Sequence, residues 1–118
     1  MASRWILGAV APAAVLASSV RADDDLGARV YAERCSACHG EHGRGDGPTA
    51  PALQPPPRDF GNPEFWKGRS AADLRAVVKA GKPGTMMPPF EGVLSDAEID
   101  AVVASLRRFA PAGTAAEK

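Results

Sequence analysis

The chain has 118 residues, which is enough for one domain and too few for two. Its 14 basic residues balance its 14 acidic residues, and no basic stripe with interleaved aromatic residues occurs, so a nucleic-acid partner is excluded. The composition includes 12 glycines and 11 prolines but few aromatic residues. The apolar core is therefore thin, and a domain this small needs an embedded group to complete it.

The first 22 residues have the composition of a secretory signal peptide. Arg4 provides a short positive region, and residues 5–20 are almost uncharged and mostly aliphatic. We expect cleavage near Ala22, which leaves an exported chain with 12 basic and 14 acidic residues and a net charge of −2. The alternative is a retained membrane anchor, although the apolar stretch is shorter than the roughly 20 residues of a spanning helix.

A helix is predicted over residues 26–37. Leu26, Val30 and Tyr31 form its apolar face, and the acidic residues 23–25 precede it, where negative charge suits the helix dipole. Gly27 costs helix stability but would allow another helix to approach closely. A frayed first turn is the alternative explanation for this glycine.

The end of this helix carries a C-x-x-C-H motif formed by Cys35, Cys38 and His39. This is the attachment pattern of c-type haem, in which both thiols bind the haem vinyl groups and the histidine is an axial iron ligand. On a helix, the three-residue and four-residue spacings place all three side chains on one face.

Three other readings of the motif stay open. A thioredoxin-like redox pair would need a βαβ pattern, which the chain lacks. A local disulfide would close a very small loop and stabilise little. A zinc site that also used His42 would crowd four ligands into eight residues, closer than the usual spacing of paired ligands. We expect His42 to be an exposed loop histidine.

Residues 40–57 are rich in glycine and proline, which excludes regular structure. A loop of this length inside a compact domain usually has a function, and wrapping a cofactor is one. After it, Phe65 and Trp66 are expected in the core or the cofactor wall. Arg58 and the Trp66 indole are candidates for contact with haem propionates.

Two more helices follow. The first is predicted over residues 70–81, where Ser70 and Asp73 form a capping-box-like start; the second is predicted over residues 95–109, with a capping box at its first turn. The apolar stripe of the second helix consists of Ile99, Val102, Val103, Leu106 and Phe109. Between the helices, a loop places Met86 and Met87 directly before two prolines, which keeps Met87 extended. Residues 111–118 are expected to be a flexible tail.

The arrangement over residues 26–110 resembles the class I c-type cytochromes. Gly27 and Tyr31 occupy the positions where that family packs a glycine and an aromatic residue against the last helix. The resemblance also implies that the carbonyl of Pro51 accepts a hydrogen bond from His39 and that Leu53 packs on the haem. It favours Met87 over Met86 as the sixth iron ligand.

The chain departs from the family at one position. Many members have a tyrosine before the leucine of the last helix, whereas here Ser105 precedes Leu106, and Phe109 is expected to provide the aromatic contact. Residues 45–48 and 55–60 resemble a bacterial subgroup of small periplasmic members.

The resemblance therefore implies an all-α cytochrome c fold over residues 23–110, with three main helices and long Pro/Gly-rich loops wrapped around one covalent haem c. The expected function is soluble, periplasmic, one-electron transfer in a respiratory chain, without catalysis. The expected partners are periplasmic or membrane-bound redox proteins, with no small-molecule substrate, and the expected state is a monomer. The alternatives are a haem-based sensor or peroxidase-like protein with an open distal site, or an electron-transfer subunit of a larger periplasmic oxidoreductase complex.

Overall fold

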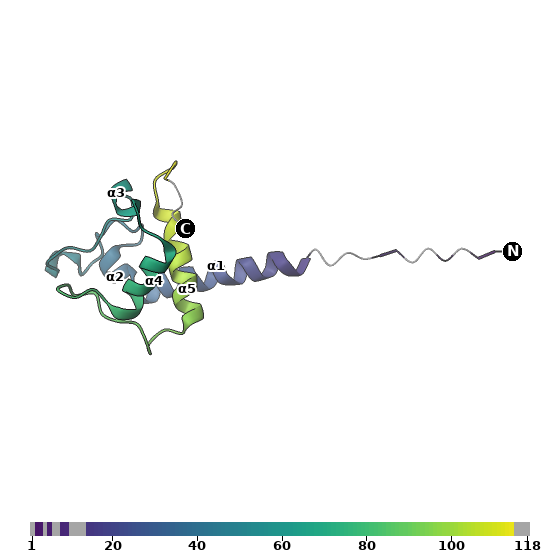
Figure 1. Cartoon of the computed structure of the whole chain (residues 1–118), viewed down its shortest axis with the longest axis horizontal. Coiled ribbons are helices and arrows are strands. Elements are labelled where there is room, and N and C mark those ends of the chain that lie inside the picture. The colour runs from purple at the N-terminus through teal and green to yellow at the C-terminus, as the bar shows by residue number, and fades with distance from the viewer. Residues whose placement is uncertain (1, 4, 6–7, 10–13, 115–118) are drawn as a thin grey trace.

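The computed structural model of the chain describes residues 2–3, 5, 8–9 and 14–114. Its elements are α1 (Ala14–Arg34), α2 (Ser36–His39), η1 (Ala50–Ala52), α3 (Pro63–Trp66), α4 (Ala71–Ala80), α5 (Asp96–Ser105) and η2 (Leu106–Phe109), where η marks a 3-10 helix (Figure 1). Within the described ranges there is no strand, only an isolated bridge between Glu91 and Leu94. The predicted all-α fold is confirmed.

The first helix differs from the prediction at both ends. It begins at Ala14 instead of residue 26, because no glycine or proline interrupts the sequence between residues 14 and 26. Figure 1 shows this N-terminal half projecting away from the rest of the domain. The helix ends at Arg34, and a separate short helix, α2, follows Cys35.

The predicted signal peptide falls partly outside the described residues, since Arg4 and several of its neighbours are among those not described. The predicted cleavage position at Ala22 lies within α1, in an exposed stretch. In the described part of the chain, no helix combines the length and the apolar composition needed to cross a membrane. Residues 115–118 of the predicted tail also lie outside the description.

The domain is built on the crossing of α1 with α5. At the crossing, a Cβ on Gly27 would overlap the backbone carbonyl of Ala101 and lie 3.0 Å from the Ser105 Cβ. Tyr31 packs on Phe109, with 5.0 Å between ring centroids. The predicted close approach at Gly27 is therefore confirmed, the frayed turn is wrong, and Phe109 supplies the expected aromatic contact.

The core gathers side chains from α1, α3, α4, α5 and η2. Its buried members are Val30, Tyr31, Phe60, Phe65, Trp66, Leu74, Leu94, Ile99, Val102, Val103 and Leu106. The predicted apolar stripe of the last helix is buried, with Phe109 half-buried at its end. The backbone tightens to a 3-10 turn, η2, at Leu106, so the single predicted helix is two consecutive segments.

Both predicted helix starts are formed as capping boxes. Ser70 Oγ accepts from the backbone N–H of Asp73 and the Asp73 carboxylate accepts from the N–H of Ser70, and the same exchange joins Ser95 and Glu98. These hydrogen bonds satisfy N–H groups that a helix start leaves unpaired.

The capping box of α5 predicts a pH dependence of stability. The hydrogen bonds from Ser95 hold the pKa of Glu98 below its ordinary value. A lowered pKa in the folded state stabilises the protein above the unfolded pKa, and this contribution is lost as pH falls through the folded value. Glu98→Gln keeps a capping amide but cannot titrate, so its deficit in unfolding free energy relative to wild type should shrink as pH falls below about 4.

Urea titrations of both proteins between pH 3 and pH 7 measure this difference. Glu33→Gln, on the exposed surface of α1, is the matched control for the loss of one carboxylate. A Glu98→Gln deficit that stays constant with pH would contradict the prediction.

Candidate functional site

A mostly apolar cavity of about 310 Å³ lies between α2, the proline-rich loop and the loop after α4. This volume is near the lower end of the range for cofactor pockets, roughly 300–1,000 Å³. The predicted site residues that line it are Cys35, Cys38, His39, Leu53, Arg58 and Met87. Pro51 and Trp66, which were also predicted, are not among its lining residues.

Helix α2 aims the motif side chains into this cavity. The N–H of His39 donates to the Cys35 carbonyl at 2.9 Å, which closes the turn and brings the two cysteines and the histidine to one side. Gly40 ends α2 with a φ of +87°, a conformation that favours glycine. Both cysteines are free thiols in the structure.

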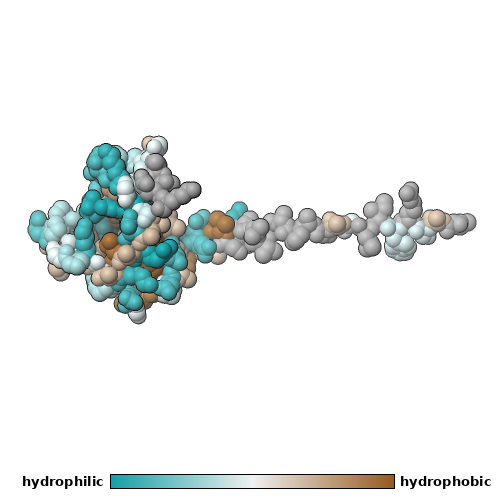
Figure 2. Space-filling view, in the orientation of Figure 1, coloured by the Kyte–Doolittle hydropathy of each residue, from teal (hydrophilic) through white to brown (hydrophobic). Residues whose placement is uncertain are grey.

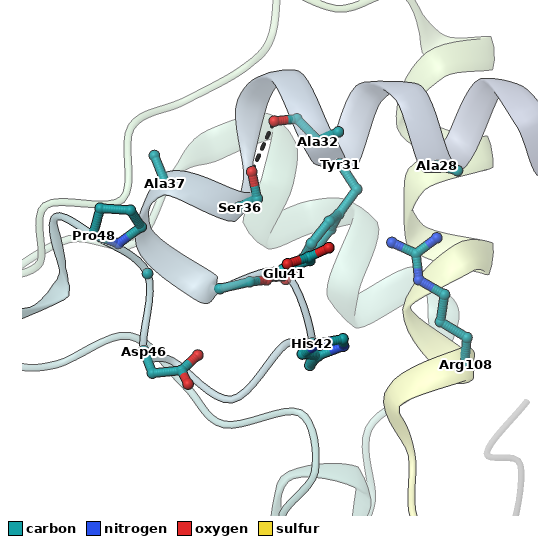
Figure 3. A pocket seen from close by; sticks show the side chains of 12 residues that line it. Ala28, Tyr31, Ala32, Ser36, Ala37, Glu41, His42, Asp46, Pro48 and Arg108 are labelled. Atoms are coloured by element: carbon teal, nitrogen blue, oxygen red, sulfur yellow. Dashed lines mark hydrogen bonds between the residues drawn. The ribbon is translucent and has the colours of Figure 1, made fainter.

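The other side of α2 faces a second cavity of about 800 Å³, which both polar and apolar side chains line (Figure 3). Ser36 and Ala37 line it, and Ser36 Oγ donates to the Ala32 carbonyl at 2.8 Å. His42 is exposed and lines this cavity, away from the one that Cys35, Cys38 and His39 share. The expectation of an exposed loop histidine at position 42 is confirmed.

The zinc alternative lacks a ligand set. Over the described residues, no three His, Cys, Asp or Glu side chains come close enough to hold a metal ion. The thioredoxin-like alternative lacks its sheet, because the same residues contain no strand.

His39 is held by a stacked ring and a backbone carbonyl. Its imidazole stacks on Phe60, with 4.6 Å between centroids and 17° between planes. Its Nδ1 lies 3.4 Å from the carbonyl oxygen of Arg58. Burial lowers the pKa of His39, and the Arg58 hydrogen bond only partly opposes this. The neutral imidazole is the form that ligates a metal.

The carbonyl beside His39 is that of Arg58, whereas the prediction assigned this role to Pro51. Pro51 is exposed in η1, whereas two backbone hydrogen bonds, from Gly45 to the His39 carbonyl and from Phe60 to the Gly43 carbonyl, draw the Arg58 segment against the histidine. Gly45 permits this approach, because a Cβ there would lie 2.6 Å from the Pro57 carbonyl oxygen. No local sequence pattern indicates this pairing, because it depends on two loops packing together.

The cysteines are in a low-polarity setting that suits attachment to an apolar macrocycle. Burial raises the pKa of the Cys35 thiol to about 11, and the neighbouring Cys38 adds to the increase. The Cys38 Sγ lies 3.3 Å from Thr49 Oγ1, which donates to the Ala37 carbonyl at 2.7 Å. Thr49 thus ties the glycine-rich loop to α2, a role that no local sequence pattern indicated.

The two methionines of the loop after α4 differ in burial. Met87 is half-buried, whereas Met86 is 69% exposed. Met87 is anchored at both backbone groups, since its N–H donates to Thr85 Oγ1 at 3.2 Å and its carbonyl accepts from the Lys82 N–H at 3.3 Å. The loop also packs on Gly81, where a Cβ would lie 2.9 Å from the Met87 carbonyl oxygen. Both methionines line the cavity, and Met87 is the more buried of the two.

The aromatic wall changes the predicted role of Trp66. Its side chain is 1% exposed, and its indole N–H donates to the Phe60 carbonyl at 2.8 Å. The indole N–H thus already has a hydrogen-bond partner inside the core. The core position was one of the two expected for Trp66, whereas the predicted contact at the cofactor cavity is not formed. Arg58 does line the cavity, with its guanidinium 5.3 Å from the Phe65 centroid. Phe60, which stacks on His39, was absent from the predicted site.

Tyr31, in α1, holds the C-terminal end of α2 in place. Its hydroxyl donates to the Gly40 carbonyl at 2.7 Å in a buried position. Tyr31→Phe should lower the free energy of unfolding by about 1 to 3 kcal/mol, because a buried carbonyl loses its donor. Urea unfolding measures this loss as a lower midpoint at constant slope; an unchanged midpoint would contradict it.

Comparison with known proteins identifies the kind of site. The family described as cytochrome c oxidase, cbb3-type, subunit III matches residues 22–105. The chain belongs to this cytochrome c family. It is therefore a c-type cytochrome domain, of the kind that carries covalently bound haem c.

Three relatives illustrate the resemblance. The chain is 35% identical over 99 residues to dihydro-heme d1 dehydrogenase of Pseudomonas aeruginosa, covering 82% of this chain but only 18% of that protein. A chain of the Kuenenia stuttgartiensis reducing HAO-like protein complex superposes with a TM-score of 0.65 at 30% identity, covering 73% of this chain and 42% of that one. The KustC0563 c-type cytochrome superposes with a TM-score of 0.60 at 29% identity, covering 72% and 98%.

The residues of this cytochrome c domain fit the haem that the family carries. Cys35 and Cys38 meet His39 at an apolar cavity, which suits two thioether bonds to the macrocycle and a nitrogen ligand for iron. The group supplies one-electron chemistry, and the protein's part is to attach it, fix the ligands and limit water.

Proposed function

We propose that this domain is a mono-haem electron carrier in which His39 and Met87 are the two axial ligands of iron. The observation that carries the proposal is the arrival of both side chains at one apolar cavity, His39 from α2 and the half-buried Met87 from a separate loop. The hydrogen bonds of the Met87 backbone to Thr85 and Lys82 support the proposal, because they hold the loop that carries Met87 in place.

His/Met ligation would leave no open position on the iron. A six-coordinate iron changes oxidation state without binding a substrate, and methionine ligation raises its reduction potential. We therefore infer that the protein exchanges electrons and is not itself an enzyme, with no small-molecule substrate. A sensor or peroxidase-like function would need an open distal site, which a bound Met87 would block.

We also propose that the protein acts as a monomer in the periplasm, as part of a respiratory chain, after cleavage near Ala22. The composition of the first 22 residues supports export, because a short positive region precedes a mostly aliphatic stretch. N-terminal sequencing of the purified holoprotein tests the cleavage, and a chain that keeps its first residues would favour a membrane anchor.

A second candidate is an electron-transfer part of a larger oxidoreductase. Two of the relatives favour it, because this chain matches only 18% of a dehydrogenase and 42% of a chain from a protein complex. Size-exclusion chromatography of the native protein from a periplasmic extract separates the two cases: a carrier elutes as a small monomer, and a subunit elutes with its partners.

Carbon monoxide binding to the reduced wild-type holoprotein tests the ligation. Because Met87 would occupy the sixth position, the visible spectrum should be that of low-spin haem c and should not change under carbon monoxide. A spectrum that shifts readily would contradict the His/Met proposal and favour the open-site alternative.

A further inference from the structure

Arginine side chains cover the aromatic rings near α3 and near η2, the C-terminal turn. The contacts, from guanidinium carbon to ring centroid, are Arg69 to Phe65 at 4.2 Å, Arg58 to Phe65 at 5.3 Å, Arg107 to Trp66 at 4.7 Å, Arg108 to Phe109 at 4.5 Å and Arg108 to Tyr31 at 5.0 Å. Each ring holds a flexible cationic side chain in place, which lowers the entropy lost when that side chain meets an anion.

Two of these arginines form no ion pair with any residue that the structure describes. Among the described residues, neither Arg69 nor Arg108 forms an ion pair, and the ion pairs that do occur join Lys67 to Glu64 and α4 to α5. Burial lowers the pKa of Arg69, and the like charge of Arg58 nearby lowers it further. The carboxylate of Asp73 raises the pKa of Arg69, but this carboxylate already accepts the hydrogen bond from the Ser70 N–H in the capping box.

The rings beneath these two arginines meet at one residue. Phe65 and Phe109 lie 5.0 and 6.2 Å from Phe60, measured between centroids, and Phe60 stacks on His39. The ring under Arg69 or Arg108 is therefore connected to His39 through one further ring, that of Phe60. Figure 1 places α3 and the C-terminal turn at the same end of the domain, and Figure 2 shows hydrophilic surface over α3.

We propose that Arg69 and Arg108 form a docking surface for a carboxylate-rich redox protein. One electron passes between the partner's redox centre and the haem iron by way of Phe65 or Phe109, Phe60 and His39. One centre is oxidised and the other reduced by a single electron, and no bond forms or breaks. The proposal rests on the proposed function, since it requires His39 to ligate the iron.

An acidic protein fits this surface better than an anionic membrane does. The surface lies at the end of a row of rings that leads to His39, and a lipid headgroup has no redox centre to use it. The whole chain has a formal net charge of +0, so the positive charge of Arg69 and Arg108, neither of which forms an ion pair with a described residue, is a local asymmetry that orients an approaching partner.

The test uses the holoprotein on a gold electrode coated with a carboxylate-terminated monolayer, which stands in for an acidic protein face. The double variant Arg69→Gln with Arg108→Gln should adsorb about tenfold more weakly at low salt, on the scale of two exposed charge contacts. The control, Arg29→Gln with Arg75→Gln, changes the net charge equally on exposed positions of α1 and α4 and should adsorb like the wild type. Equal loss in both variants would overturn the docking surface.

The electron route has its own readout, the interfacial electron-transfer rate of adsorbed protein. Phe60→Leu should slow this rate severalfold while adsorption is retained, and an unchanged rate would overturn the route. If Phe60→Leu fails to hold haem, Phe65→Leu together with Phe109→Leu removes both rings that contact Phe60 and leaves Phe60 on His39.

Two further outcomes separate the explanations. If the arginine double variant loses binding to phosphatidylserine vesicles but adsorbs on the electrode like the control, the surface is a membrane contact and the proposal is overturned. If the wild type shows no reversible one-electron wave at a neutral electrode, the proposed function itself fails. A normal wave with unimpaired adsorption of the double variant overturns only the docking surface.

Discussion

Replacing Met87 by alanine should open the iron and lower its reduction potential. If Met87 is the sixth ligand, its loss exposes a coordination position, and the reduced variant should bind carbon monoxide whereas the wild type does not. The potential should fall by on the order of 0.1 V, within the roughly 0.8 V range that axial ligands span. Visible spectroscopy under carbon monoxide and protein-film voltammetry measure the two effects.

Met86→Ala is the matched control for this experiment. It removes the same side chain from the preceding position of the same loop, where the methionine is 69% exposed. We expect its spectrum and potential to stay close to those of the wild type. If Met86→Ala instead opened the iron and Met87→Ala did not, the ligand would be assigned to the wrong methionine; if neither did, His/Met ligation would be wrong.

Enlarging Gly27 should separate α1 from α5 and destabilise the whole domain. A Cβ at this position overlaps the backbone carbonyl of Ala101, which cannot rotate away as a side chain could. Gly27→Ala should therefore lower the free energy of unfolding by about 1 to 3 kcal/mol. This is the opposite of its usual effect in a helix, where alanine is favoured over glycine by about 1 kcal/mol. Gly27→Val should cost more.

Urea unfolding of the holoprotein, followed by far-UV circular dichroism, measures these changes. Ala32→Val enlarges an exposed position of the same helix and should cost only a few tenths of a kcal/mol, which is the ordinary penalty of valine in a helix. Equal losses at positions 27 and 32 would show that helix propensity, and not the α1–α5 contact, determines the effect.

Local patterns predicted the parts of the fold that depend on neighbours in sequence. The two capping boxes and the buried stripe of α5 follow from spacing over one to four turns, and the structure confirms them. Boundaries were less well predicted. Helix α1 starts twelve residues earlier than expected because nothing in the sequence stops it, and η2 tightens the end of the last helix.

The predictions for the site also differ in outcome between local patterns and contacts across the fold. Six of the eight predicted residues meet at one cavity, because the motif spacing and the Met-Pro pattern are local. The other two predictions, at Pro51 and Trp66, concerned hydrogen bonds between distant segments and differ from the structure. Irregular loops have no periodicity from which the packing of one against another can be deduced.

The sequence by itself determined the helical class of the domain and the C-x-x-C-H attachment motif, and it predicted that Met87 would join His39 at the same cofactor. Only the tertiary structure decided which carbonyl lies beside His39, that Phe60 stacks on its ring, and that Arg69 and Arg108 cover the rings behind it. The physical reason is that these contacts join loops and helix ends far apart in sequence. Their geometry is set by the packing of α1 against α5 and by glycines that let backbones pass closely.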